Sequence, residues 1–204
     1  SRTLLALIIL LSVGHLQGYA DNPYEIDDSL YAIFQRAMGY KDRRCLVLAD
    51  SMQAEAQKIG DKKAECLALI LPVQYYRSKG SWEQLHQASD ELREASRQNG
   101  YLQYYYYPYD LEANYLMGYE RLIEAEQLLR DMLSQALEDK NDYGLGLCYN
   151  LMGNLYNQRR SYLFAIEYYD QAFDFYKKAH QPADGLCSNA SQACIKARRF
   201  DRAI

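Results

Sequence analysis

The chain has 204 residues, of which 49% are hydrophobic and 25% charged, and its formal net charge is −4. That length suits either one domain or an elongated array of repeats. Proteins that bind nucleic acid usually carry a basic patch over a whole face, whereas lysines and arginines are scattered here and the balance is acidic. We therefore expect no nucleic-acid partner.

The first twenty residues have the pattern of a secretory signal peptide. Arg2 precedes an apolar run from Leu4 to Val13, and the small residues Gly18 and Ala20 stand just before a polar segment. A membrane anchor is the alternative, but the run is shorter than the roughly 20 residues that span a bilayer. We expect a signal peptide at residues 1–20 and a periplasmic or otherwise extracytoplasmic mature protein, with membrane contact only through a segment beyond this sequence.

From residue 21 to residue 204 the sequence predicts helical repeats. Apolar residues such as Leu122, Ala125, Leu129 and Leu133 recur at helical spacing, and no comparable strand pattern occurs. Turn-forming pairs recur about every 40 residues, with a second break midway in each interval, as repeat arrays show. We therefore expect an all-α fold, an α-solenoid of stacked antiparallel helix hairpins with about four and a half units.

One position in the second helix of each unit supports this regular stack. Small or apolar residues recur there at intervals of about 40 residues, and helices approach closely only where a side chain is short. The helix that should begin at the last of these positions is not completed, so we expect more protein after Ile204. The aligned residues are Val47, Leu85, Ala125, Ala165 and Ala203.

The fourth unit resembles the tetratricopeptide repeat. That repeat has an aromatic residue three positions before a Leu-Gly pair, then a tyrosine, and its second helix carries Ala-x-x-x-Phe-x-x-Ala. The units here are longer than the usual 34 residues. The resemblance implies a solenoid that binds a protein or a peptide. The matching residues are Tyr149, Met152, Gly153 and Tyr156 in the first helix and Ala165, Tyr169 and Ala172 in the second.

The same resemblance implies where a partner would bind. In tetratricopeptide arrays the first helix of each unit lines the concave surface, and the matching positions here are rich in carboxamides. These groups both donate to and accept from a peptide backbone, although a merely solvated face is the alternative interpretation. The candidate partner-binding residues are Gln74, Arg77, Tyr107, Asn114, Asn150, Asn154, Asn157 and Asn189.

Chaperone-binding members of that family place lysine at one position of this surface. Successive units here hold Ile70, Asp110, Asn150 and Asn189 at that position. A chaperone partner is therefore not expected.

Residues 100–115 are rich in tyrosine, with four in succession before Pro108. We expect these rings to surround the first helix of the third unit and to pack between units, with hydroxyl groups reaching solvent. The alternative is that one or two rings line a binding groove. Pro108 and Pro72 should each kink a helix or mark its start.

Little in the sequence indicates catalysis. His15, His86 and His180 lie far apart, and we find no metal-ligand spacing, no nucleophile elbow and no glycine-rich phosphate loop. The five cysteines suit small buried thiols. We expect no enzyme in this segment, no metal and no cofactor.

A second resemblance concerns residues 22–31, NPYEIDDSLY. Together with the signal peptide and the long repeats, this stretch resembles the periplasmic sensor half of certain bacterial membrane-bound histidine kinases. It implies the extracytoplasmic sensor part of a two-component signal-transduction protein, with the kinase beyond this sequence. A free periplasmic scaffold and the sensor region of a repeat-linked transcription regulator are the alternatives.

Overall fold

The computed structural model describes residues 22–198, apart from the side chain of Asp184. The expected signal peptide and Ala203 lie outside these residues. Within the described range the chain forms nine helices and no strand. The helices are α2 (Asp28–Met38), α3 (Arg44–Ile59), α4 (Lys62–Lys79), α5 (Trp82–Gln98), α6 (Leu102–Gly118), α7 (Leu122–Glu138), α8 (Asp142–Gln158), α9 (Tyr162–Lys178) and α10 (Asp184–Lys196).

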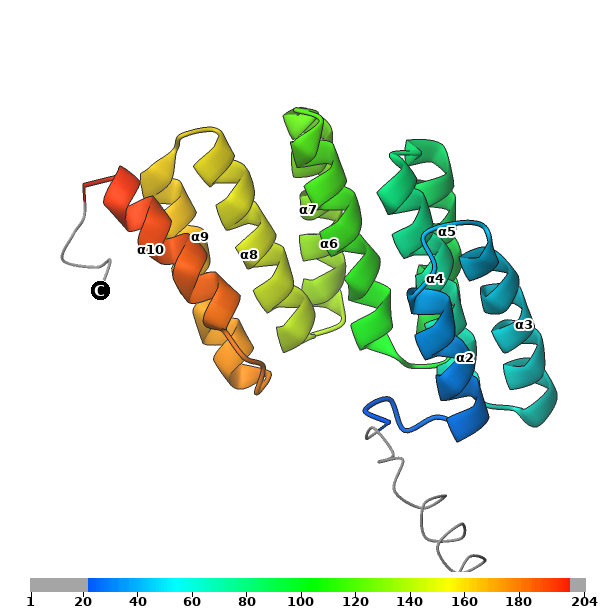
Figure 1. Cartoon of the computed structure of the whole chain (residues 1–204). Helices are drawn as coiled ribbons and strands as arrows, with labels where there is room; N and C mark the ends of the chain where they lie inside the picture. The colour runs from blue at the N-terminus through cyan, green and yellow to red at the C-terminus, as the bar shows by residue number, and fades with distance from the viewer. Residues whose placement is uncertain (1–21, 199–204) are drawn as a thin grey trace, which may run out of the picture.

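The helices stand in chain order as a row of antiparallel neighbours, with α2 and α10 at opposite ends (Figure 1). Even-numbered helices contact one another in series, from α2 to α4 and onward to α10, while no two odd-numbered helices between residues 22 and 198 do so. The even-numbered layer is therefore the inner, concave side of the array. The fold is an all-α helical-repeat solenoid, as the sequence predicted.

The repeat length is set by turns at a fixed spacing. From residue 60 to residue 180, every twentieth residue has a positive φ angle, so one helix and its turn occupy 20 residues and a hairpin occupies 40. Glycine adopts this conformation at no steric cost, whereas other residues adopt it under strain. The positions are Gly60, Gly80, Gly100, Glu120, Lys140, Arg160 and His180.

The predicted crossing position is occupied in three units and shifted in the first. Leu85, Ala125 and Ala165 are fully buried. The prediction for Val47 is wrong, because that residue is 64% exposed, and Cys45, 5% exposed and 40 residues before Leu85, takes the equivalent place. The backbone N–H of Arg44 donates to the Asp42 side chain at 2.9 Å, so α3 begins earlier relative to its buried face than the turn signal indicated.

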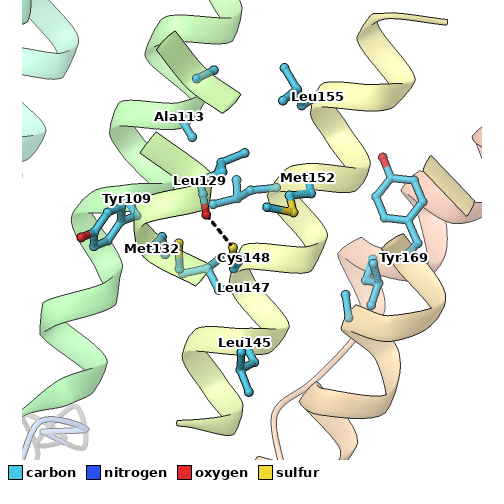
Figure 2. Packing of buried hydrophobic residues seen from close by; sticks show 14 of the residues in the cluster. Tyr109, Ala113, Leu129, Met132, Leu145, Leu147, Cys148, Met152, Leu155 and Tyr169 are labelled. Atoms are coloured by element: carbon cyan, nitrogen blue, oxygen red, sulfur yellow. Dashed lines mark hydrogen bonds between the residues drawn. The ribbon is translucent and has the colours of Figure 1, made fainter. Parts of the chain in front are cut away.

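Helix α8 packs closely against its neighbours because three of its residues are glycines. A Cβ atom at Gly153 would overlap the ring of Tyr169, and one at Gly146 would lie 2.6 Å from the ring of Tyr176. Buried leucine and methionine side chains fill the space between α7 and α8, where the Cys148 thiol donates to the backbone oxygen of Leu129 at 3.2 Å (Figure 2). Burial raises the pKa of this thiol to about 12.

The other cysteines follow the expectation except at one position. Cys45, Cys66 and Cys194 are buried, but Cys187 is exposed, so the interpretation as a buried thiol is wrong there. The first turn of α10 has no helix packed over this side chain among the described residues.

Most tyrosines of the 100–115 stretch serve packing. Tyr104, Tyr105, Tyr106 and Tyr109 are buried. The Tyr106 hydroxyl donates to Asp139 and does not reach solvent. Helix α6 continues through Pro108 and α4 through Pro72, so neither proline marks a helix start.

Candidate functional site

All eight candidate partner-binding residues lie on even-numbered helices and therefore on the concave layer. Helix α4 carries Gln74 and Arg77, α6 carries Tyr107 and Asn114, α8 carries the three asparagines 150, 154 and 157, and α10 carries Asn189. The repeat geometry alone brings these distant parts of the sequence into one row, because each unit presents the same helix face to the same side.

Several of these side chains already bond to the next unit. Between α4 and α6, the Gln74 amide donates to the Tyr107 hydroxyl at 2.7 Å. Between α8 and α10, the Asn189 amide donates to Asn154 Oδ1 at 3.2 Å. Lys196 also donates to Asn157 Oδ1, at 3.4 Å. These carboxamides therefore fix neighbouring units relative to one another, and a ligand would have to exchange its own hydrogen bonds for theirs.

Asp110 lies within the same row and differs from its neighbours in charge. Asn114 donates to its Oδ1 at 2.7 Å and to its backbone oxygen at 2.8 Å. No described lysine or arginine forms an ion pair with this half-buried carboxylate. Burial raises the pKa of Asp110, and the charge of Arg77 and the bond from Asn114 oppose the rise.

Asn150 holds the second unusual polar group of this row. Its Oδ1 atom is buried and has no hydrogen-bond partner among the described residues. Buried carbonyl oxygens are nearly always paired, so an orphan acceptor in a row of exposed and half-buried polar residues calls for a donor from outside the fold. Asp110 and Asn150 are 40 residues apart, at equivalent positions of the adjacent helices α6 and α8.

A hollow of about 650 Å³ opens at the end of the concave layer where α6 and α8 begin. Tyr143 lines it, and the charge of Asp110 helps to raise the pKa of that tyrosine after burial, so the carboxylate lies behind this side chain. The other residues around the hollow are Gly100, Leu102, Gln103, Asn141 and Gln181.

The sequence did not indicate a second hollow, which lies on the opposite layer. It measures about 430 Å³ between α7 and α9, with α8 as its floor. Tyr149, Tyr156 and Tyr168 line it, and their rings stand 5.1 to 6.2 Å apart. Two of these tyrosines belong to the repeat signature, which is the signal that could have located the hollow.

A buried ionic cluster between α5 and α6 was also missed. Glu112 is fully buried, accepts from Arg93 at 2.5 Å and lies 2.6 Å from His86 Nδ1. The Arg93 guanidinium stands over the Tyr109 ring at 4.6 Å and donates to Asp90 at 2.7 Å. Because its members pair with one another, this cluster is a structural element of the array and has no free group for a ligand.

Two further surveys concern metal ions and membranes. Among residues 22–198, no group of three or more His, Cys, Asp or Glu side chains has a metal-binding arrangement. In the same part of the chain, no helix has the length and apolar character that crossing a bilayer requires.

In comparisons with known proteins, no family model matches the chain and no curated protein matches its sequence.

Proposed function

We propose that this chain is an exported tetratricopeptide-like module whose concave layer binds an extended segment of a protein or peptide. The observation that carries the proposal is the pair of unsatisfied acceptors on that layer, the Asp110 carboxylate and Asn150 Oδ1. Such groups cost free energy when buried without a partner, so they are retained most readily where a ligand supplies one.

The proposal extends to signalling. In it, the array is the extracytoplasmic sensor part of a two-component protein whose histidine kinase lies beyond this sequence. Ligand binding would change bonds that join neighbouring units, such as Gln74 to Tyr107 and Asn189 to Asn154, and so alter the curvature of the solenoid. An element with two arrangements that a ligand biases is the physical requirement for such an output.

Binding is tested by probing an immobilised library of extended peptides with the purified full chain. The Asn150→Ala and Asp110→Asn variants should lose the selected peptides. The control is Asp131→Asn on α7, because Asp131 is exposed on the opposite layer and pairs only with Gln127, at 2.9 Å. Equal binding by all four proteins would refute the assignment of the concave layer.

The export proposal needs its own experiment. The first twenty residues, fused to a phosphatase that folds only outside the cytoplasm, should give an active enzyme in a bacterial host. A fusion that starts at Asp21 should stay inactive. Activity from both fusions, or from neither, would contradict a signal peptide at residues 1–20.

A further inference from the structure

Asp110 and Asn150 share a chemical property that narrows the ligand. Both offer acceptor oxygens, and neither has a cationic partner within the described chain. The nearest cation is Arg77, an exposed side chain that acts on Asp110 through space without forming an ion pair. The group that is missing from this place must therefore carry several hydrogen-bond donors and a positive charge.

Three tyrosines surround these oxygens. Tyr107 is on α6 with Asp110, Tyr143 is on α8 with Asn150, and Tyr176 on α9 forms a hydrogen bond with Asn150. Burial, and then the negative charge of Asp110 among other causes, raises the pKa of each of these phenols. The rings therefore lie close around the carboxylate and remain neutral at physiological pH.

Neutral aromatic rings beside a carboxylate favour one class of ligand. Ring faces attract a cation within about 6 Å of the centroid, and a charge-assisted hydrogen bond to a carboxylate is about twice as strong as a neutral one. An anion would be repelled by Asp110, and an aliphatic group would leave both acceptors unsatisfied. The hollow of about 650 Å³ beside Tyr143 provides the approach from the concave side.

We propose that Asp110, Asn150 and the three tyrosines form a subsite for a primary ammonium or guanidinium group, supplied by a lysine or arginine side chain of the bound peptide. The inference rests on the proposed function for its source of the cation. The recognition chemistry itself is shared with free alkylammonium and alkylguanidinium ions, so both sources are tested.

The test uses the full chain and capped tripeptides Ala-X-Ala, in which X is lysine, arginine, norleucine or glutamate, with n-butylammonium and n-butylguanidinium as free cations. Calorimetry gives the affinities, and NMR shifts of the Asn150 side-chain amide report the location. We expect the lysine and arginine peptides to bind at least about tenfold more tightly than the norleucine peptide. The glutamate peptide should be the weakest.

Variants separate recognition from structure. Asp110→Asn should remove the preference for cations, and Asp131→Asn should keep it. Arg77→Gln should tighten cation binding, because it removes a charge that repels the ligand. If Arg77 were instead the internal partner of Asp110, Arg77→Gln and Asp110→Asn would both destabilise the free protein, and that result would overturn the inference.

The outcomes also separate the subsite from the proposed function. Peptides that bind without regard to the charge of X would overturn the subsite and leave peptide binding intact. Free cations that shift Asn150, when no peptide binds anywhere, would support the subsite and count against peptide binding. If neither cations nor peptides bind, both proposals fail.

Discussion

Arg97 near the end of α5 donates two hydrogen bonds, of 3.1 and 2.9 Å, to the carboxylate of Asp139 at the end of α7. Helices α5 and α7 do not pack directly, so this ion pair and the Tyr106 hydroxyl, which donates to the same carboxylate, join them across α6. Asp139 is 11% exposed. The hydrogen bonds from Arg97, more than any other cause, lower the pKa of Asp139.

Replacing this residue should make stability less dependent on pH. A lowered pKa in the folded state stabilises the fold above the unfolded carboxyl value of about 3.9 and loses that contribution as pH falls further. Asp139→Asn should therefore cost about 1–2 kcal/mol at neutral pH and flatten the acid side of the stability profile. Urea unfolding between neutral pH and about pH 3 measures both effects. An unchanged acid slope would contradict the assigned role.

Asp110→Asn should have the opposite effect on the free protein. Burial raises the pKa of Asp110, so its contribution to stability is greatest below the unfolded pKa and is lost as pH rises through the folded pKa. At neutral pH the ionised carboxylate destabilises the fold, and the amide should raise the free energy of unfolding by about 0.5–2 kcal/mol.

The measurement is urea unfolding of Asp110→Asn and of the original chain at two pH values. The gain should shrink near pH 4, where the carboxylic acid is largely neutral in both states. Asp131→Asn serves as the control, with no pH-dependent gain. A loss of stability in Asp110→Asn would show that the carboxylate has a stabilising partner.

The sequence was sufficient for the helices and their period because turn residues and apolar spacing are local signals. It was not sufficient for relations that depend on side chains meeting across units. Val47 was chosen over Cys45 because a shift of two residues changes no local pattern. The pairing of Glu112 with Arg93, 19 residues apart, could not be predicted because neither residue has a local pattern that indicates burial.

The candidate site shows the same division. Its residues were placed on the correct helices because the repeat dictates which helix faces the concave side. The sequence could not show that Asn154 bonds to Tyr169 while Asn150 Oδ1 has no partner. That difference depends on the angle between α8 and its neighbours, which no single residue encodes.

Gly153 should tolerate no side chain. A Cβ atom there would overlap the ring of Tyr169, which is almost fully buried and bonds to Asn154 at 2.9 Å. Gly153→Ala should therefore cost about 1–3 kcal/mol in spite of the higher helix propensity of alanine. Gly185→Ala is the control in α10, because nothing lies within 4 Å of its added Cβ atom. Thermal unfolding should show a lower midpoint for Gly153→Ala alone.

The 20-residue turns provide a graded test of backbone strain. Lys140 and Arg160 have φ angles of 50° and 62°, whereas Gly100 holds the same place with φ of 77°. Lys140→Gly and Arg160→Gly should each raise stability by about 0.5–1 kcal/mol, because relief of strain exceeds the added entropy of the unfolded chain. Gly100→Ala should lower it by about 1 kcal/mol. The same sign of change in both directions would contradict the assigned strain.

The Glu112 cluster should behave as a coupled pair that apolar residues can replace. Forty residues later the equivalent positions hold Met152 in α8 and Leu133 in α7. Glu112→Met alone leaves the Arg93 guanidinium, only 8% exposed, without its main partner and should cost about 3–5 kcal/mol. Arg93→Leu alone leaves the buried carboxylate with His86 as its remaining partner and should cost a similar amount.

The double variant Glu112→Met with Arg93→Leu copies a pair that the array already uses. It should recover most of the loss, because apolar residues of similar volume commonly match or exceed a buried ion pair in stability. The four proteins form a double-mutant cycle, and urea unfolding should give a coupling energy of at least about 2 kcal/mol. Additive losses would mean that Glu112 and Arg93 act independently, and the ionic cluster would then not be the element that holds α5 against α6.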